Sequence, residues 1–343
     1  MKRRVCFIHT YEHIISIENL LLAWQEFLSG KKMRKDVLHF GRNLMSNIIL
    51  LHEDLANGIY RHSNYHAFNV SDPKPRNIHK ASVRDRLLHH ALYRELYPFF
   101  DRTFISTSFS CRRYKGMHRA LDQFRAYSHK ASKNKTRTVW VLKCDIRKFF
   151  ASVDQVALLN ILDGYIEDKR IISLLSEIIR SFHSTENDRG LPLGNLTSQL
   201  LVNVYMNEFD QFVKHKLKAK YYIRYADDFV FLSDDKAWLE SILPRVAAFL
   251  GERLKLSLHP DKVFIRTLAS GVDFLGWVHF PNHRVIRTGT KRRMWKRLIE
   301  TDGKEQTVQS YLGLLGHGNA QKVRGSIAAQ YLSRGAPEER TII

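Results

Sequence analysis

Two periods of hydrophobic residues alternate along this chain. Apolar side chains recur at helical spacing over residues 11–30, where Ser29-Gly30 supplies a stop, and again over 38–57. These segments predict an N-terminal helical extension over residues 1–62. The same pattern predicts further helices, the first of them capped by Ser82, over residues 82–93, 155–162, 168–183, 236–254 and a long stretch that ends near 217.

Strand-like runs of apolar, aromatic and β-branched residues lie between these helices. They cover residues 65–70, 136–145, 221–233 and 272–278, and the third of them predicts a tight hairpin of two strands. Two prolines predict a loop or the end of a hairpin over 71–78. The basic, helical segment 289–332 predicts a small separate subdomain with a core of Trp295, Leu298, Leu312, Leu314 and Leu315. Together these elements predict an α+β fold.

The net charge of the chain limits the classes of function that are expected. Lys and Arg number 55 against 34 Asp and Glu, a formal charge of +21, while 44% of the 343 residues are apolar. A globular chain this basic is expected to bind a polyanion, with nucleic acid ahead of a membrane surface. We find no apolar run near the roughly 20 residues that span a bilayer. Three scattered cysteines and no recognisable secretion signal predict a reducing, cytoplasmic setting.

Asp227 and Asp228 form the tip of the predicted hairpin. Asp is common in turns, so an acidic turn without function is the ordinary interpretation. Adjacent like charges are tolerated best beside a cation, however. The clearest strand delivers a third carboxylate, Asp145, at its end, where a helix N-cap is the alternative. Three converging carboxylates would hold two Mg²⁺ ions, which on a basic chain predicts nucleotidyl transfer.

Two further segments are candidates for contacts with nucleic acid. Basic and aromatic residues interleave around Arg112, Arg113 and Lys115. Such a mixture suits a single strand, with cations on the backbone and rings under the bases. Lys74 and Arg76 lie on the proline-containing loop, where a solvated basic turn is the alternative to a phosphate contact.

Four segments resemble motifs of the reverse transcriptases, in that family's order and separation. They are Tyr225-Ala226-Asp227-Asp228, the Asp145 segment ending in Phe149-Phe150, the Gly194 loop and Phe274-Leu275-Gly276-Trp277. The resemblance spans about residues 68–277. It implies a right-hand polymerase with fingers over 63–135, a palm with an antiparallel sheet over 136–280 (finger elements inserted), and a helical thumb and tail over 281–343.

The resemblance also implies catalytic roles. Asp145, Asp227 and Asp228 match the metal ligands, and the backbone of Ile146 completes one metal shell. The expected cofactor is two Mg²⁺ ions, with Mn²⁺ as a possible substitute. Lys262 matches a lysine that protonates pyrophosphate.

Substrate contacts follow from the same resemblance. Phe150 matches an aromatic gate that excludes a ribose 2′-hydroxyl. Lys74 and Arg76 match cations that clamp the incoming triphosphate. Gly194 lies in the loop beside the incoming nucleotide, and Gly276 matches the strand that supports the primer end.

Within this superfamily, which includes the group II intron enzymes, the chain resembles most the reverse transcriptases of diversity-generating retroelements. It is compact, without room for maturase and endonuclease regions, and residues 84–92 and 110–116 are similar to that family's. The segment Leu193-Gly194-Asn195-Leu196-Thr197-Ser198-Gln199 replaces the Gln-Gly…Ser-Pro form usual elsewhere.

Leu193 has a physical consequence for copying. A glutamine beside the nascent base pair would constrain the incoming nucleotide by hydrogen bonds, whereas leucine offers only apolar contact, and apolar sites reject mismatches less well. The resemblance implies error-prone copying of a dedicated template RNA opposite adenine, with dNTPs, an RNA/cDNA hybrid and a small basic oligomeric accessory protein. Two alternatives are an antiphage-defence reverse transcriptase with its own noncoding RNA and a catalytically dead RNA-binding scaffold.

Overall fold

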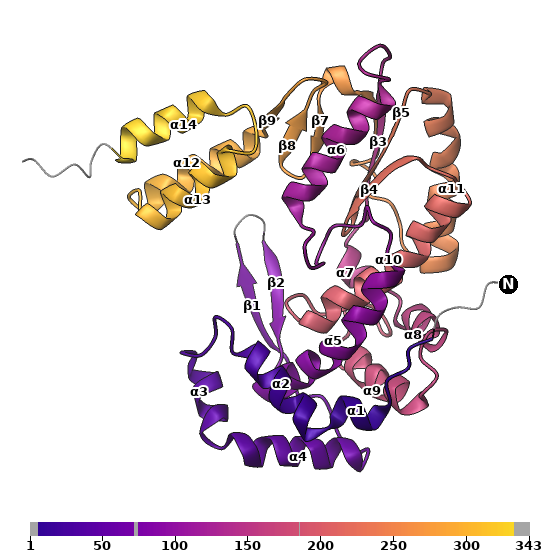
Figure 1. Cartoon of the computed structure of the whole chain (residues 1–343), viewed down its shortest axis with the longest axis vertical. Coiled ribbons are helices and arrows are strands. Elements are labelled where there is room, and N and C mark those ends of the chain that lie inside the picture. The colour runs from indigo at the N-terminus through magenta and orange to yellow at the C-terminus, as the bar shows by residue number, and fades with distance from the viewer. Residues whose placement is uncertain (1–5, 72–74, 185, 333–343) are drawn as a thin grey trace, which may run out of the picture.

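The computed structural model of the chain describes residues 6–71, 75–184 and 186–332. Figure 1 shows a helical part at the bottom, a β-sheet with its helices at the top, and the C-terminal helices projecting to one side. A long β-hairpin rises from the helical part toward those C-terminal helices (Figure 1). The predicted α+β class is therefore confirmed.

The N-terminal helices are shorter than the two predicted, because a polar residue interrupts each. Ser16 caps a second helix by accepting a hydrogen bond from the Asn19 N–H at 3.1 Å, and Asn43 separates the next pair. The elements are α1 (Tyr11–Ile15), α2 (Ile17–Phe27), α3 (Lys35–Arg42) and α4 (Leu44–Ala56). The first three pack on α5 (Val83–Thr103), which Ser82 caps as predicted, and α4 packs on the first three. All of them share one apolar core with the central sheet.

The exposed hairpin consists of β1 (His66–Val70) and β2 (Arg76–Lys80), paired so that Val70 faces Arg76. The second strand thus begins inside the segment 71–78, and of the two predictions for this segment, a loop or the end of a hairpin, the pairing confirms the hairpin.

The central sheet has four antiparallel strands in the order β4-β5-β3-β6. Their bounds are β3 (Trp140–Asp145), β4 (Tyr221–Tyr225), β5 (Asp228–Ser233) and β6 (Phe264–Thr267). The predicted hairpin is confirmed as β4 and β5. The strand predicted from residue 136 begins at Trp140, and β6 was not predicted.

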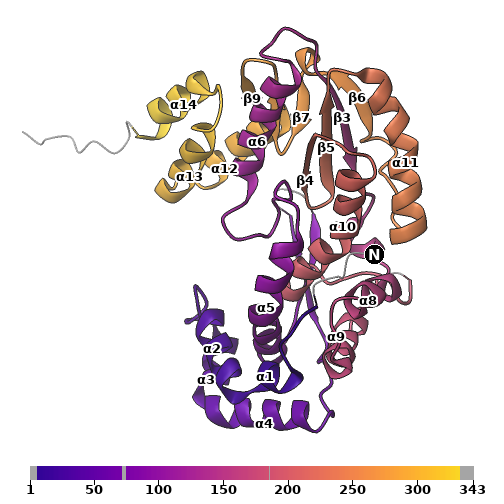
Figure 2. The ribbon, with the colours of Figure 1, turned by 45° about the vertical axis from the view of Figure 1, so that its right-hand side comes forward.

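Helices cover both faces of this sheet because its strands carry buried apolar side chains on both faces. Figure 2 shows α6 (Met117–Ala131) and α11 (Lys236–Leu254) on opposite sides. Successive residues point to opposite faces of a strand, so Phe229 and Phe231 meet α10 (Leu196–His215) and α11, while Val230 meets α6. The short helices below the sheet are α7 (Phe149–Ser152), α8 (Gln155–Asp163) and α9 (Lys169–Arg180).

The prediction of a single strand over 272–278 is wrong. This segment contains two strands of a second, three-stranded sheet. Leu275 and Gly276 have φ of 51° and 82° and reverse the chain between Phe274 and Trp277. The strands are β7 (Val272–Phe274), β8 (Trp277–His279) and β9 (Arg284–Ile286), preceded by a 3₁₀ turn, Leu268–Ser270.

The C-terminal helices have a hydrophobic core of their own, as predicted. They are α12 (Thr288–Glu300), α13 (Glu305–Leu315) and α14 (Gln321–Ile327), followed by a π-helical turn, Ala328–Leu332. Leu298 and Leu315 are buried as expected, and Met294 completes the centre. Within the described part of the chain, no helix combines the length and apolar character that crossing a membrane requires.

Candidate active site

The three aspartates predicted as metal ligands lie at one end of the central sheet. Asp145, the last residue of β3, pairs across the sheet with Asp228, the first residue of β5. Strand alternation puts both on the face that α6 covers further along. Asp227 lies in the turn between β4 and β5, and its carbonyl accepts a hydrogen bond from the Ile146 N–H at 3.2 Å. Backbone pairing thus holds all three residues at one place.

Two lysines contact these carboxylates. Lys262 Nζ donates to Asp145 Oδ1 at 2.9 Å, as expected for a lysine predicted at the site. Lys143 Nζ lies 3.5 Å from Asp228 Oδ2. The sequence analysis missed Lys143, although its spacing of two residues from Asp145 on a strand places it on the same face.

The two lysines do not fully neutralise the negative charge of the three aspartates. Burial raises the pKa of Asp228 to about 7, and the neighbouring charges of Asp145 and Asp227 act in the same direction, against Lys143. Burial and Asp145 also raise the pKa of Asp227, while Lys262 and Arg76 lower it. Asp228 Oδ1 is buried without a hydrogen-bond partner among the described residues. Unpaired carboxylate oxygens of this kind fit a hard divalent cation.

The three carboxylates do not form one closed ligand set. In the described ranges, only His9, His13 and Glu95 bring three ligand atoms within 4.8 Å of one another.

A buried arginine holds the turn that carries Asp227. The Arg224 side chain is 1% exposed and binds both oxygens of Asp210, with Nη2–Oδ2 at 2.7 Å and Nε–Oδ1 at 2.8 Å. It also donates to Ser108 Oγ at 3.0 Å and to the carbonyl of Ala226 at 3.2 Å. Ala226 has φ of 56°, a conformation that a non-glycine residue adopts only when its surroundings impose it.

The sequence analysis missed this network. The available signal was a charged residue in the middle of an otherwise apolar strand, Tyr221–Tyr225, because arginine is almost never fully buried without a partner. Its partner Asp210 lies on α10 and is fully buried too.

The loop of Leu193 and Gly194 packs against β2. The Leu193 carbonyl accepts from the His79 N–H at 3.0 Å, and Asn195 Nδ2 donates to the His79 carbonyl at 3.1 Å. Gly194 has φ of 107°, and a Cβ there would lie 2.8 Å from Ile78 Cγ2. Only glycine allows this approach, so the loop and the hairpin are positioned together.

Other residues predicted to bind the nucleotide surround this loop. Arg76 begins β2, is exposed, and acts electrostatically on Asp227. The carbonyl of Phe150 accepts from the Leu191 N–H at 2.8 Å, which joins α7 to the start of the loop. Lys74, the other predicted phosphate contact, lies outside the described residues.

The residues predicted to bind primer and template have different surroundings. Arg112 is 5% exposed, and it donates to the Asp101 carboxylate at 2.7 Å and to three backbone carbonyls, so its contacts are structural. Arg113 is exposed, while Lys115 Nζ donates to the Ser106 carbonyl at 2.8 Å. The ring of Tyr114 is 86% exposed beside them. Gly276 occupies the tight turn between β7 and β8.

An antiparallel sheet with paired aspartates at the end of its strands, flanked by helices and a separate helical C-terminal unit, defines a right-hand polymerase. A solved structure of apo telomerase from Candida tropicalis, truncated from its C-terminal domain, matches it with a TM-score of 0.50 at 12% identity. The match covers 66% of this chain and 55% of that chain and shows a shared fold.

Residues 70–279, more than half of the chain, match the family described as reverse transcriptase (RNA-dependent DNA polymerase). The chain therefore belongs to the reverse transcriptase family.

Curated relatives include protein YkfC of Escherichia coli K12 and the group II intron-encoded protein LtrA of Lactococcus lactis subsp. cremoris. YkfC is 27% identical over 63% of this chain and 65% of its own length. LtrA is 21% identical over 84% of this chain and 59% of its own length. The chain thus spans less than two thirds of these relatives.

Proposed function

We propose that this protein is an RNA-directed DNA polymerase that makes cDNA by two-metal nucleotidyl transfer. The observation that carries the proposal is the cross-strand pair Asp145–Asp228 beside the Asp227 turn in a member of the reverse transcriptase family. The orphaned Asp228 Oδ1 supports it, because the carboxylates have unused capacity for a cation.

Asp145, Asp227 and Asp228, with the Ile146 carbonyl, would hold the two Mg²⁺ ions, for which Mn²⁺ is a substitute. When bound, these ions lower the pKa of the primer 3′-hydroxyl and neutralise the departing pyrophosphate. The Lys262 ammonium group, which donates to Asp145 Oδ1 at 2.9 Å, would lie beside the ions and serve the pyrophosphate as a proton donor.

The remaining residues position the substrate in this proposal. Lys74 and Arg76 bind the triphosphate from the β1–β2 side, and Phe150 excludes the ribose 2′-hydroxyl of the incoming dNTP. Arg113, Lys115 and the exposed Tyr114 ring contact the primer–template hybrid. Gly276 keeps the turn that supports the primer end. The predicted fingers, palm and thumb boundaries at 63, 136 and 281 belong to the proposal.

Primer extension on an RNA template tests the activity. Asp145→Asn and Asp228→Asn each remove a charged ligand with little change in volume, so each should lower the rate by at least about a thousandfold, the scale of a lost catalytic electrostatic contact. Asp163→Asn, at an exposed ion pair with Lys169, is the matched control and should retain full activity. Extension that survives either active-site change would refute the proposed mechanism, and wild-type protein that makes no cDNA would leave only an RNA-binding scaffold.

We further propose the error-prone copying of a diversity-generating retroelement, carried by Leu193. Its side chain is half-buried at the loop against β2 and offers no hydrogen bond to a base pair. Leu193→Gln should reduce misincorporation opposite template adenine roughly tenfold, because a hydrogen-bonding side chain rejects mismatches better. Sequencing of the cDNA products measures this. Leu196→Gln, a similar change three residues further on, is the control, and equal adenine error rates in wild type and Leu193→Gln would exclude Leu193 as the cause.

The proposed partners are a dedicated template RNA and a small basic oligomeric accessory protein, in a cytoplasmic setting. The formal charge of +21 supports binding to a polyanion. An antiphage-defence reverse transcriptase with its own noncoding RNA is the alternative. Sequencing the RNA that co-purifies distinguishes the two, since a near-repeat of a variable gene supports the retroelement and an isolated structured RNA supports defence.

A further inference from the structure

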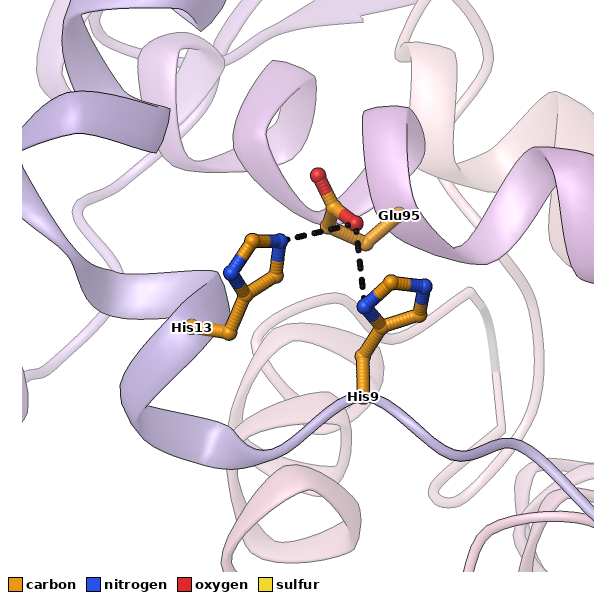
Figure 3. A group of neighbouring side chains, drawn as sticks. All are labelled: His9, His13 and Glu95. Atoms are coloured by element: carbon orange, nitrogen blue, oxygen red, sulfur yellow. Dashed lines mark ion pairs between the residues drawn. The ribbon is translucent and has the colours of Figure 1, made fainter.

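A group of two histidines and a glutamate lies outside the candidate active site, where the chain before α1 meets α5 (Figure 3). His13 Nε2 lies 3.2 Å and His9 Nδ1 lies 3.6 Å from the same carboxylate oxygen, Glu95 Oε2. These three ligand atoms all lie within 4.8 Å of one another. Figure 3 shows both rings turned toward that oxygen from two different segments of the chain.

The backbone around these side chains is held before any ligand arrives. The Phe7 N–H donates to the Tyr165 carbonyl at 2.8 Å, which fixes the segment that carries His9. The Thr10 side chain caps α1 by accepting from the His13 N–H. Glu95 belongs to α5, the long helix at the centre of the main core. Because little ordering remains to be done, most of the binding free energy of a ligand is retained.

The donor set has the character of a transition-metal site. Imidazole nitrogen and carboxylate oxygen together suit Zn²⁺, which commonly takes two histidines and one glutamate and keeps a further position for water. Mg²⁺ prefers a shell of oxygen atoms and competes poorly for such nitrogens. The side chains of His9 and His13 are 43% and 52% exposed, so an ion has access, while Glu95 is only 13% exposed.

We propose that His9, His13 and Glu95 bind one Zn²⁺ ion, or a similar borderline metal, which ties the chain before α1 to α5. The site is independent of the polymerase reaction. A metal here joins the N-terminal segment to the helix that supports the whole lower half of the molecule. Its role is structural, and the open position is filled by water.

Zinc titration of the chelator-treated full chain tests this, with excess Mg²⁺ present to occupy the active-site carboxylates. Competition against a chromophoric chelator should show one tight Zn²⁺ in wild type. His13→Gln and Glu95→Gln should each weaken it by about tenfold or more, as expected when a ligand is removed. His39→Gln, an exposed histidine on the neighbouring α3, is the matched control and should bind as wild type does.

A second measurement separates this site from adventitious binding by other histidines. With Cu²⁺ as the probe, electron paramagnetic resonance should show two coupled imidazole nitrogens in wild type and one in His13→Gln. Zinc affinity that is the same in wild type, His13→Gln and Glu95→Gln overturns the proposal and leaves a simple histidine–glutamate ion pair. Since His9 and His13 are about half exposed and Glu95→Gln keeps the size of its side chain, circular dichroism of the metal-free variants should match that of wild type.

Discussion

At the scale of single residues, the candidate site depends on a buried ion pair as much as on its aspartates. The Arg224 side chain donates hydrogen bonds to Asp210, to Ser108 and to the carbonyl of Ala226, which is next to Asp227. The pair lies in the core, where a charge left alone is costly, whereas removal of both charges is often tolerated. The network therefore couples core stability to the position of the turn.

Replacement of Arg224 separates these two effects. Arg224→Met should destabilise the protein by about 3–5 kcal/mol, because it leaves the Asp210 carboxylate buried and unpaired. The double variant Arg224→Met/Asp210→Leu should recover most of that stability in urea unfolding. Its turn stays untethered, however, so kcat for primer extension should remain about tenfold lower while the KM for dNTP changes little.

The matched control is the exposed pair at the other end of the same hairpin. Arg137 Nη1 lies 2.8 Å from Asp234 Oδ2, with side chains 56% and 29% exposed. Arg137→Met should cost under about 1 kcal/mol and leave kcat unchanged. If kcat in the Arg224/Asp210 double variant equals that of wild type, Arg224 serves stability alone.

At the scale of elements, the Gly194 loop is in close contact with β2 near the site. Gly194→Ala would place a methyl group 2.8 Å from Ile78 Cγ2 at a φ of 107°. We expect a loss of more than about 1 kcal/mol in unfolding free energy from strain and a raised KM for dNTP, because the hairpin that carries Arg76 must shift.

Two further variants separate the steric clash with Ile78 from the backbone strain as causes of the lost stability in Gly194→Ala. Adding Ile78→Ala to Gly194→Ala removes the clash and should restore part of the stability, while the backbone strain remains. Gly251→Ala lies within α11 with open space around it and should stabilise the protein by up to about 1 kcal/mol, since alanine favours a helix. A KM for Gly194→Ala equal to that of wild type would show that the loop does not position the nucleotide.

The sequence predicted the positions of helices and strands better than the turns that interrupt them. Helix and strand periods located α5, α11 and the β4–β5 hairpin, because apolar spacing follows directly from burial. The turn at Leu275-Gly276 was missed because Leu275 adopts a left-handed φ that its residue type does not signal. Asp145, Asp227 and Lys262 come together as expected, whereas Arg224–Asp210 depends on the packing of α10 against β4, which no local pattern reveals.

At the scale of the whole molecule, two buried histidines, His89 and His279, and the half-buried His90 make the fold sensitive to acid. Burial lowers the pKa of His279 to about 4, with Arg284 adding to the effect. Burial also lowers the pKa of His89 to about 3 and of His90 to about 4. These side chains are neutral in the folded protein, but they take up protons in the unfolded chain once the pH falls below about 6.5.

The contribution of these histidines to stability should therefore be full above about pH 6.5 and fall as the pH drops toward 4, whereas the raised pKa of Asp228 acts in the opposite direction. For His279 alone the loss at about pH 5 is on the order of 2 kcal/mol. Urea unfolding at about pH 7.5 and about pH 5 measures it, and His279→Phe, which keeps a ring against Phe124, should reduce the difference between the two pH values. The exposed His129→Gln is the control, and a pH dependence unaffected by His279→Phe would show that this histidine does not contribute.

The backbone beside Arg224 joins two surfaces of the molecule. The Arg224 N–H donates to the Thr107 carbonyl and the Phe109 N–H donates to the Arg224 carbonyl, both at 3.0 Å. The exposed Tyr114 follows that segment on the loop before α6. A displacement of this loop is therefore transmitted, through one strand-like pairing, to the hairpin that carries Asp227. In the proposed function, the contact of Tyr114 with the primer–template hybrid and the position of Asp227 would thus be mechanically coupled.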